Sequence, residues 1–545
     1  MASMLRSFRF VPAFALLSAA AVHANSVAAS DVAKLVPEGT VIYLEIPSLE
    51  RLDAAIHKVM SAFAPAQAEG FDVDMILGEL DVPGSAEEID HKKPFAFCLV
   101  LPAQPGAQPM PTMLVPAVSA ENYAKSVAES GVAMQATVAG SYVVVSSAPI
   151  TPAATPPAIA LGLPAGEVAC RIDMKRLVAH FRPLIDMGLA QAGPLMAAGA
   201  AQSAPGMDMA PMMDTYVSGL RSFLDSGETL DLALRLEGDR FEFATNFTAL
   251  EKSALAEFGS KEKTDLRDLA RLIDASAPVS VVIGMDQAAM LKHFTPFLDA
   301  AINMYPEASR ASMKKAMDNW DELAAQTGPG FCVNADFTPT GMQQVVYMRP
   351  RDATKLLEAY KSMMTAMPGC TLDELKTSDV GGVQVTRSRL HVDPQAFELT
   401  GQPAATSAMV ERMYGKDGLA LAYATKGGVT ALVLGGDDAF LASSLGRIST
   451  ATQAPASLTR SLEQVAGLNP TFVVHYDFGK LAKSFAGFMP IGAPGMPSEM
   501  PDFAAKLVIC GGIDGRTWKM ATSTDLAELG VAFRKMTEAA ASSAK

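Results

Sequence analysis

The segment Thr-Val-Ile-Tyr-Leu-Glu-Ile at residues 40–46 is decisive for the fold, because a similar apolar strand, Ser-Val-Val-Ile-Gly-Met, returns at residues 280–285. A helical pattern follows each strand, from Ser48 to about Ala62 and from Asp286 to about Asn303. A strand and helix that recur in the same order predict a repeated supersecondary unit.

Further matches follow in the same order along the chain. The pairs are Phe97-Cys98 with Phe331-Cys332, Asp173 with Asp477, and Ala244-Thr245 with Ala521-Thr522. We therefore predict two tandem copies, a first module at 31–258 and a second at 271–540, joined by a charged linker at 259–270. The changing offsets place an insertion in the second copy, around the Gly381-Gly382 turn, and one in the first, at 194–213.

Tight turns set the fold class. Gly-containing turns at Ala139-Gly140, Gly238-Asp239 and Gly427-Gly428 each separate two apolar runs. Strands joined by such turns must be antiparallel. We expect mainly antiparallel sheets covered by helices on one face, which is the α+β class.

Four short patterns predict helix caps. Asp173 and Asp477 stand where a strand gives way to a helical pattern, so each is expected to cap a helix by accepting amide hydrogen bonds. Thr248-x-x-Glu251 and Asp525-x-x-Glu528 have the spacing of a capping box.

The first residues predict a cleavable signal peptide over 1–24. Arg6 and Arg9 precede an apolar stretch, and Val22-His23-Ala24 offers small residues at the cleavage positions, with cleavage after Ala29 as the alternative. We expect an exported protein, periplasmic or secreted, with no transmembrane segment after cleavage and only peripheral contact with the envelope. The formal net charge is −14, and loss of the two arginines makes the mature chain more acidic. An acidic chain without a basic face is not expected to bind nucleic acid.

No motif predicts catalysis, a cofactor or a metal. The five cysteines are far apart, and we expect Cys98, Cys170, Cys332 and Cys510 to be buried, whereas Cys370 lies in a turn-like sequence and is expected to be exposed. The seven histidines show no ligand spacing, and the chain contains no HExxH, GxSxG or phosphate-binding glycine loop. Gly435-Gly436-Asp437 is expected to form a glycine turn with an Asp cap.

Two apolar sequences rich in Met, Pro and Gly are the most distinctive candidates for function. Both contain Ala-Pro-Gly-Met, and both are expected to be surface loops, in which flexible thioethers suit adaptable apolar contact. The candidate contact residues are Pro205, Met207, Met209, Met212, Met213, Pro494, Met496 and Met500. The alternatives are that these side chains pack back onto the protein, or that the clustered sulfurs bind Cu(I).

The opening Leu35-Val-Pro-Glu-Gly-Thr-Val-Ile-Tyr43 and the later Asp173-x-x-x-Leu177 resemble large exported bacterial proteins classed as a domain of unknown function, which begin with a Leu-Pro-x-x-Thr strand. The resemblance implies an envelope protein of a Gram-negative bacterium. It supplies no catalytic residues.

These observations favour a non-enzymatic exported protein that binds a protein partner, an envelope component or an apolar ligand through the Met-containing loops. One alternative is an exported hydrolase whose site is assembled from distant residues. The other is periplasmic Cu(I) binding by the methionine clusters.

Overall fold

The computed structural model describes residues 30–543 except 103–106, 151, 204–209, 263–265, 304–306, 339–340, 368, 394–410, 466–467 and 489–500. The predicted signal peptide therefore lies outside the described residues. The chain divides into two compact units. Unit 1 comprises Met1–Arg182, Leu224–Ala256 and Arg516–Arg534, and unit 2 comprises Pro183–Phe223, Glu257–Gly515 and Lys535–Lys545. Each unit combines helices with an antiparallel sheet, which confirms the α+β class.

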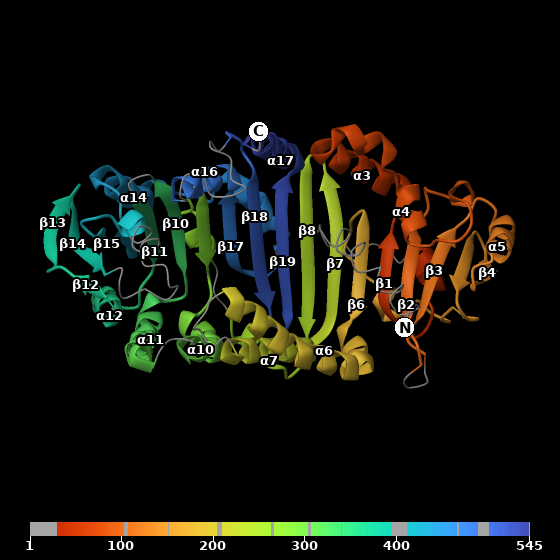
Figure 1. The fold of residues 1–545 in the computed structure, drawn as a ribbon, viewed down its shortest axis with the longest axis horizontal. Helices are drawn as coiled ribbons and strands as arrows, with labels where there is room; N and C mark the ends of the chain where they lie inside the picture. The colour runs from red at the N-terminus through yellow and green to blue at the C-terminus, as the bar shows by residue number, and fades with distance from the viewer. Residues whose placement is uncertain are drawn as a thin grey trace. The chain divides into compact units, whose positions relative to one another are not determined.

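The described residues of unit 1 form nine strands in the order β4-β5-β3-β2-β1-β6-β7-β8-β19, with every neighbouring pair antiparallel (Figure 1). The strands are β1 (Thr40–Ile46), β2 (Phe95–Val100), β3 (Met110–Pro116), β4 (Gln135–Ala139), β5 (Tyr142–Ser146), β6 (Val168–Asp173), β7 (Gly227–Glu237), β8 (Arg240–Ala249) and β19 (Thr517–Asp525). The predicted turns at Ala139-Gly140 and Gly238-Asp239 join β4 to β5 and β7 to β8, as expected.

Strand β19 comes from near the end of the chain, yet it pairs with β8 along its whole length. Ala244 stands opposite Ala521, and Arg240 stands opposite Asp525. These two alanines are also matched residues of the sequence repeat, so β8 and β19 are related by a local two-fold axis through the alanine pair. Both alanines are almost fully buried, at 1% and 2% exposure, and their small side chains leave room for close packing.

Three helices cover one face of the unit 1 sheet: α3 (Leu49–Phe63), α4 (Val73–Glu79) and α5 (Ala120–Glu129). Ser48 and Ser119 begin α3 and α5 by accepting amide hydrogen bonds. Leu49 and Tyr123 are fully buried in the core against the strands. The opposite face is closed by the 3-10 turns η1 (Val32–Leu35) and η4 (Ala158–Ala160), which pack over Tyr43, Cys98 and Leu114.

Unit 2 contains the order β14-β15-β16-β11-β10-β9-β17-β18, all antiparallel, with β12 and β13 paired one after the other along the outer edge of β14. The strands are β9 (Val279–Ile283), β10 (Phe331–Thr338), β11 (Gly341–Met348), β12 (Cys370–Leu372), β13 (Lys376–Val380), β14 (Val383–Val392), β15 (Leu419–Lys426), β16 (Val429–Leu434), β17 (Asn469–Asp477) and β18 (Lys506–Asp514). The predicted turns at Gly381-Gly382 and Gly427-Gly428 both form hairpins, with positive φ at all four glycines.

The helices within unit 2 are α9 (Arg267–Ala270), α10 (Gln287–Asn303), α11 (Glu307–Thr327), α12 (Ala353–Ala366), α14 (Asp438–Thr450), α15 (Ala456–Gln464) and α16 (Phe478–Phe488). Four further helices have residues in both units, namely α6 (Met174–Ser203), α7 (Ala210–Ser226), α8 (Ala254–Lys261) and α17 (Leu526–Ser543). The predicted linker 259–270 contains the end of α8 and all of α9, and Leu266 within it is fully buried.

Helices cover both faces of the unit 2 sheet, so the prediction that they cover one face is wrong for this unit. Leu432 and Leu434 pack in the same cluster as Leu356 of α12. On the other face, the Tyr347 hydroxyl donates to the Ser444 carbonyl of α14 at 2.9 Å. The physical reason is that β16 is apolar on both sides and all six of its residues are buried, as in strands sandwiched between two layers.

Three of the four predicted caps are confirmed. Asp173 accepts from the Arg176 amide at 2.9 Å, Asp477 from the Lys480 amide at 3.1 Å, and Asp525 from the Glu528 amide at 3.0 Å. The cap predicted at Thr248 is wrong, because Thr248 remains in the ladder of β8 opposite Thr517.

Ser253 takes that place ahead of α8, accepting from the Ala256 amide at 3.2 Å. Asp437 caps α14 after two glycines with positive φ, as expected from Gly435-Gly436-Asp437.

Candidate functional site

The predicted Met-containing loops lie mostly outside the described residues. Those outside are Pro205, Met207, Met209, Pro494, Met496 and Met500. Met212 and Met213 are described, and both belong to helix α7, so their assignment to a loop is wrong. Met213 is only 9% exposed, so little of its side chain is available for contact with a partner.

All five cysteines are buried and unpaired with one another. This confirms the prediction for Cys98, Cys170, Cys332 and Cys510 and shows that the prediction of an exposed Cys370 is wrong. Cys370 begins β12 and points into the apolar cluster beneath α12, at 6% exposure. Burial raises the pKa of its thiol, which disfavours the thiolate form required of a nucleophile.

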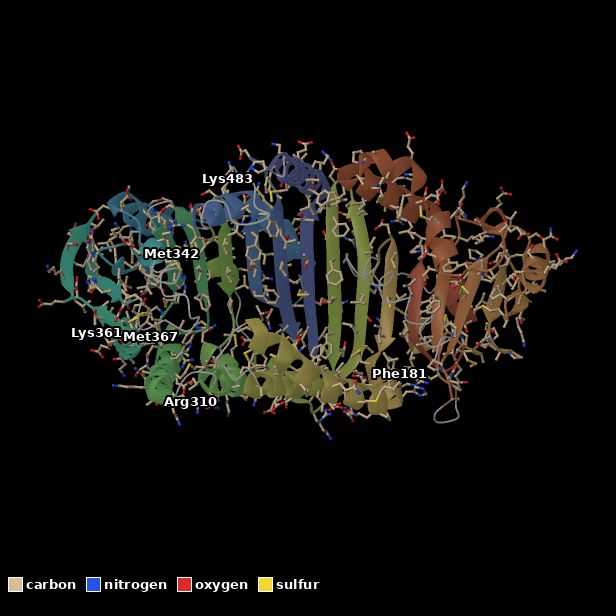
Figure 2. The ribbon with its side chains drawn as sticks, viewed as in Figure 1. Phe181, Arg310, Met342, Lys361, Met367 and Lys483 are labelled. Carbon is tan, nitrogen blue, oxygen red and sulfur yellow. The ribbon has the colours of Figure 1, made fainter. Side chains whose placement is uncertain are left out.

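A pocket of about 560 Å³ opens beside this cysteine, at the end of α12. Its lining is Thr365, Ala366, Met367, Gly369, Cys370, Thr371, His391, Val392 and Asp393, and Met367 marks its place in Figure 2. His391, which lines the pocket, has its Nε2 at 3.0 Å from Asp373 Oδ1. A cysteine, a histidine and a carboxylate in one place could suggest a hydrolytic site.

The strand register argues against that chemistry. Cys370 is opposite Val392, whereas His391 is opposite Thr371. Since successive side chains of a strand point to opposite faces, the thiol and the imidazole lie on opposite faces of the ladder. A nucleophile and its base must be within hydrogen-bond reach of each other, and these two groups are not arranged for it. Within the described part of the chain, no group of three or more His, Cys, Asp or Glu side chains is placed to hold a metal ion.

The most unusual surface of unit 1 is the side of β7, β8 and β19 on which their large apolar residues are aligned. The cross-strand register places Leu230 beside Phe247, Leu232 beside Thr245, and Leu234 beside Phe243. On strand β19, Trp518 lies opposite Phe247 and Met520 lies opposite Thr245. We call this surface the unit 1 apolar face; its residues are Leu230, Leu232, Leu234, Leu236, Phe241, Phe243, Phe247, Trp518 and Met520. All except Phe247 are intermediate in exposure, and Leu232 and Leu234 pack at the border of the unit 1 core cluster.

The opposite side of the same strands carries charges and small residues, and it is more deeply buried. Asp231 and Glu242 are 9% and 2% exposed. Arg171 forms a bidentate pair with Asp231, and Arg240 Nε lies 2.8 Å from Glu242 Oε2. In an ordinary amphipathic sheet the apolar side chains are the buried ones and the charged side chains are exposed. In β7 and β8 the leucines and most of the phenylalanines are partly exposed, whereas the carboxylates on the other side are buried.

Unit 2 also has an apolar surface, on β9, β10, β17 and β18, most of which are different strands of the repeat from those of the unit 1 apolar face. Val281 lies beside Val333 on one side and Val474 on the other. We call this surface the unit 2 apolar face; its residues are Val279, Val281, Ile283, Val333, Phe472, Val474, Tyr476, Leu507 and Ile509. All of them are partly exposed. The alternate residues of the same strands form a closed core, in which Val282, Val473 and Cys510 are fully buried.

His475 lies in that closed core at 0% exposure, opposite Ser280 and Val508. Neither of its ring nitrogens has a hydrogen-bond partner within the described residues. Burial lowers the pKa of the imidazole, which is therefore held in its neutral form. This histidine is a structural group and takes no part in either apolar face.

Sequence reasoning missed both apolar faces, although their signal is present. The alternation Leu230, Leu232, Leu234, Leu236 predicts a half-buried strand, and ordinarily the leucine side would be its buried side. Only the structure shows that the leucines are the more exposed set. Among the described helices, none has the length and apolar composition needed to cross a bilayer.

Comparison with known proteins gives little further guidance. No family model and no curated protein matches the chain. Crystal form I of the protein TP0453 aligns at a TM-score of 0.22 and 8% identity, covering 50% of this chain and 98% of that one. Crystal form IV of TP0453 aligns at 0.23 and 10% identity, covering 49% and 96%. Scores of this size do not establish a common fold.

Proposed function

We propose that this chain is a non-enzymatic exported protein of the bacterial envelope that binds an apolar ligand on its apolar sheet faces. One observation carries the proposal: in each unit, large aliphatic and aromatic side chains stay partly exposed on a sheet face while the alternate residues are buried. Partly exposed apolar side chains gathered on one surface are typical of sites that bind ligands or partners.

The chemistry of the two faces suits a ligand without strong polarity. The side chains of the two faces are Leu, Val, Ile, Phe, Trp and Met, with one Tyr, Tyr476. Apolar pockets with few polar groups bind through burial of surface rather than through directed hydrogen bonds. The acidic net charge of −14 makes an anionic ligand a poor partner for the whole chain.

We also infer that residues 31–258 and 271–540 are tandem copies of one module, as the repeat in the sequence suggests. The support is that their strand pairings follow one pattern. In unit 1, β1 pairs with β2 and β6, and the chain of partners continues through β3, β5 and β4. In unit 2, β9 pairs with β10 and β17, and the partners continue through β11, β16 and β15. The segment β12–β14 is then the insertion of the second copy.

The proposal includes export, which is supported by the predicted signal peptide at residues 1–24. It also includes ligand contact through the Met-containing loops, most of whose residues lie outside the described chain. The loops would add adaptable apolar contacts to the faces, since thioether side chains fill irregular surfaces. Cleavage is tested by N-terminal sequencing of the protein isolated from its native envelope, where a start at Asn25 or Ser30 is expected.

The ligand proposal is tested with N-phenyl-1-naphthylamine, a neutral fluorophore that brightens in apolar sites. Met520→Glu places a carboxylate in the β19 strand of the unit 1 apolar face, and Val474→Glu places one in the β17 strand of the unit 2 apolar face. Each should weaken probe binding by about ten- to a hundredfold, because one apolar contact of about 1.5–3 kcal/mol is lost.

The matched controls are Met75→Glu and Val118→Glu, at side chains that are 39% and 73% exposed elsewhere in unit 1. They should bind the probe like the wild type. Equal probe binding by all five proteins would refute the assignment to the sheet faces. Mass spectrometry of organic extracts from the native protein then identifies the ligand.

A further inference from the structure

The free edge of the unit 1 sheet is strand β4, a five-residue strand that carries no charged residue, proline or bulge. Among the described strands, β4 pairs with β5 and with no other. Its register with β5 runs without a bulge from Gln135 to Ala139. Val138 on this strand is 42% exposed, and Gln135 and Thr137 are exposed as well.

Charge is missing from this region altogether. No Asp, Glu, Lys or Arg occurs between Glu129 and Glu167. Natural sheets discourage edge-to-edge pairing with lysines, prolines or bulges on the edge strand. The edge strand of unit 2 follows that rule, because β13 carries Lys376 and Asp379. Strand β4 carries none of these devices.

The corresponding edge in unit 2 is already occupied by a strand. There, β15 holds the place that β4 holds in unit 1, at the end of the partner series β11, β16, β15. Strand β14 pairs with it antiparallel, from Val385 opposite Ala424 to Leu390 opposite Leu419. The sheet architecture of this chain therefore accepts an antiparallel strand at this position.

We propose that the β4 edge of unit 1 pairs antiparallel with the β4 edge of a second copy of this chain. Two observations select a second copy as the occupant. An antiparallel pair of two β4 strands centred on Thr137 would set Ala136 opposite Val138 and Gln135 opposite Ala139, so that no charge faces a like charge. Each copy has a formal net charge of −14, so two copies repel each other. Because segment 130–166 contains no charged residue, two copies that approach each other through this segment meet the least electrostatic repulsion.

The first test is sedimentation equilibrium of the full mature chain over micromolar concentrations. A reversible monomer–dimer equilibrium is expected. Val138→Lys introduces two ammonium groups into one interface and should raise the dimer dissociation constant at least about tenfold. Val380→Lys, the same change on the charged edge strand β13, is the control and should leave the constant unchanged. Because Val138 is exposed, circular dichroism should report an unaltered fold.

The second test fixes the register. Directly opposite residues of an antiparallel pair have Cα atoms roughly 4.5–5.5 Å apart, which falls within the range that a disulfide spans. Thr137→Cys should therefore form an intermolecular disulfide on mild oxidation, whereas Thr377→Cys on β13 should not. The native cysteines are buried and do not compete.

Three results would overturn the proposal. They are a wild-type chain that stays monomeric at every concentration, a Val138→Lys dimer as tight as the wild type, and cross-linking of Thr137→Cys no faster than that of Thr377→Cys. A monomer that instead binds an uncharged synthetic strand peptide along β4 would also exclude the second copy as occupant.

Discussion

Arg171 of β6 holds together three parts of unit 1, and its removal gives a quantitative test of how that sheet face is stabilised. Its Nε and Nη2 donate to the two carboxylate oxygens of Asp231 at 2.6 and 2.8 Å. Its Nη1 and Nη2 donate to the carbonyls of Leu161 and Gly162 at 2.6 and 3.2 Å. The hydrogen bonds to Asp231 raise the pKa of the guanidinium above its usual value, so it stays charged.

The substitution Arg171→Leu leaves the Asp231 carboxylate without its cation. The side chains of Arg171 and Asp231 are only 17% and 12% exposed. Breaking a buried pair by removal of one partner costs about 3–5 kcal/mol. Since water reaches this pair to a small extent, we expect the lower end, about 3 kcal/mol. The double variant Arg171→Leu/Asp231→Leu removes both charges and should regain most of that loss.

Urea unfolding measures these free energies. Trp518 lies in β19 of unit 1 and Trp320 in α11 of unit 2, so a Trp320→Phe background confines the fluorescence signal to unit 1. Limited proteolysis adds a local readout, because loss of the Arg171 bonds frees the Pro-rich segment 152–163.

The control for this experiment is Arg516→Leu. Arg516 pairs with Glu228 in the same unit, but the two side chains are 46% and 37% exposed. An exposed pair contributes less than about 1 kcal/mol. A loss below about 1 kcal/mol for Arg171→Leu, or a double variant no more stable than the single one, would refute the reasoning.

Four further predictions concern unit 2. The pKa of His475 is lower in the folded chain than in the unfolded chain, so the unfolded chain takes up its proton first as the pH falls. The free energy of unfolding should therefore decrease as the pH falls below about 6.5. In urea titrations between pH about 7.5 and about 5.5, His475→Leu should make the free energy of unfolding less dependent on pH. Gly435→Ala should destabilise by more than about 2 kcal/mol in thermal unfolding, because φ is +67° and the new Cβ would meet the Met342 carbonyl oxygen at 1.9 Å. Gly446→Ala, in the middle of α14 with nothing within 4 Å, should instead stabilise by about 0.5–1 kcal/mol. Asp477→Ala should cost about 1 kcal/mol through loss of the cap on α16, and an unchanged unfolding midpoint would count against that role.

The sequence by itself determined the local features of this protein. Glycine turns such as Gly427-Gly428, and caps such as Asp173 and Asp477, are formed by residues adjacent in the chain, so their chemistry is visible without a fold. The α+β class follows from the same information, because tight turns between apolar runs require antiparallel strands. The burial of four cysteines inside apolar strands also follows from their neighbours in sequence.

Only the tertiary structure decided the features that depend on distant segments. Thr248 has the sequence of a cap but stays in a strand because β19, from near the end of the chain, pairs with it. Cys370 lies in a turn-like sequence but is buried because α12 packs over it. The apolar faces depend on the same kind of contact. The alternation of leucine with charged and small residues in the sequence shows that one side of β7 is apolar. Which of the two sides of β7 remains exposed is determined by the elements that pack against the opposite side. Long-range packing decides exposure, and the candidate site is defined by exposure.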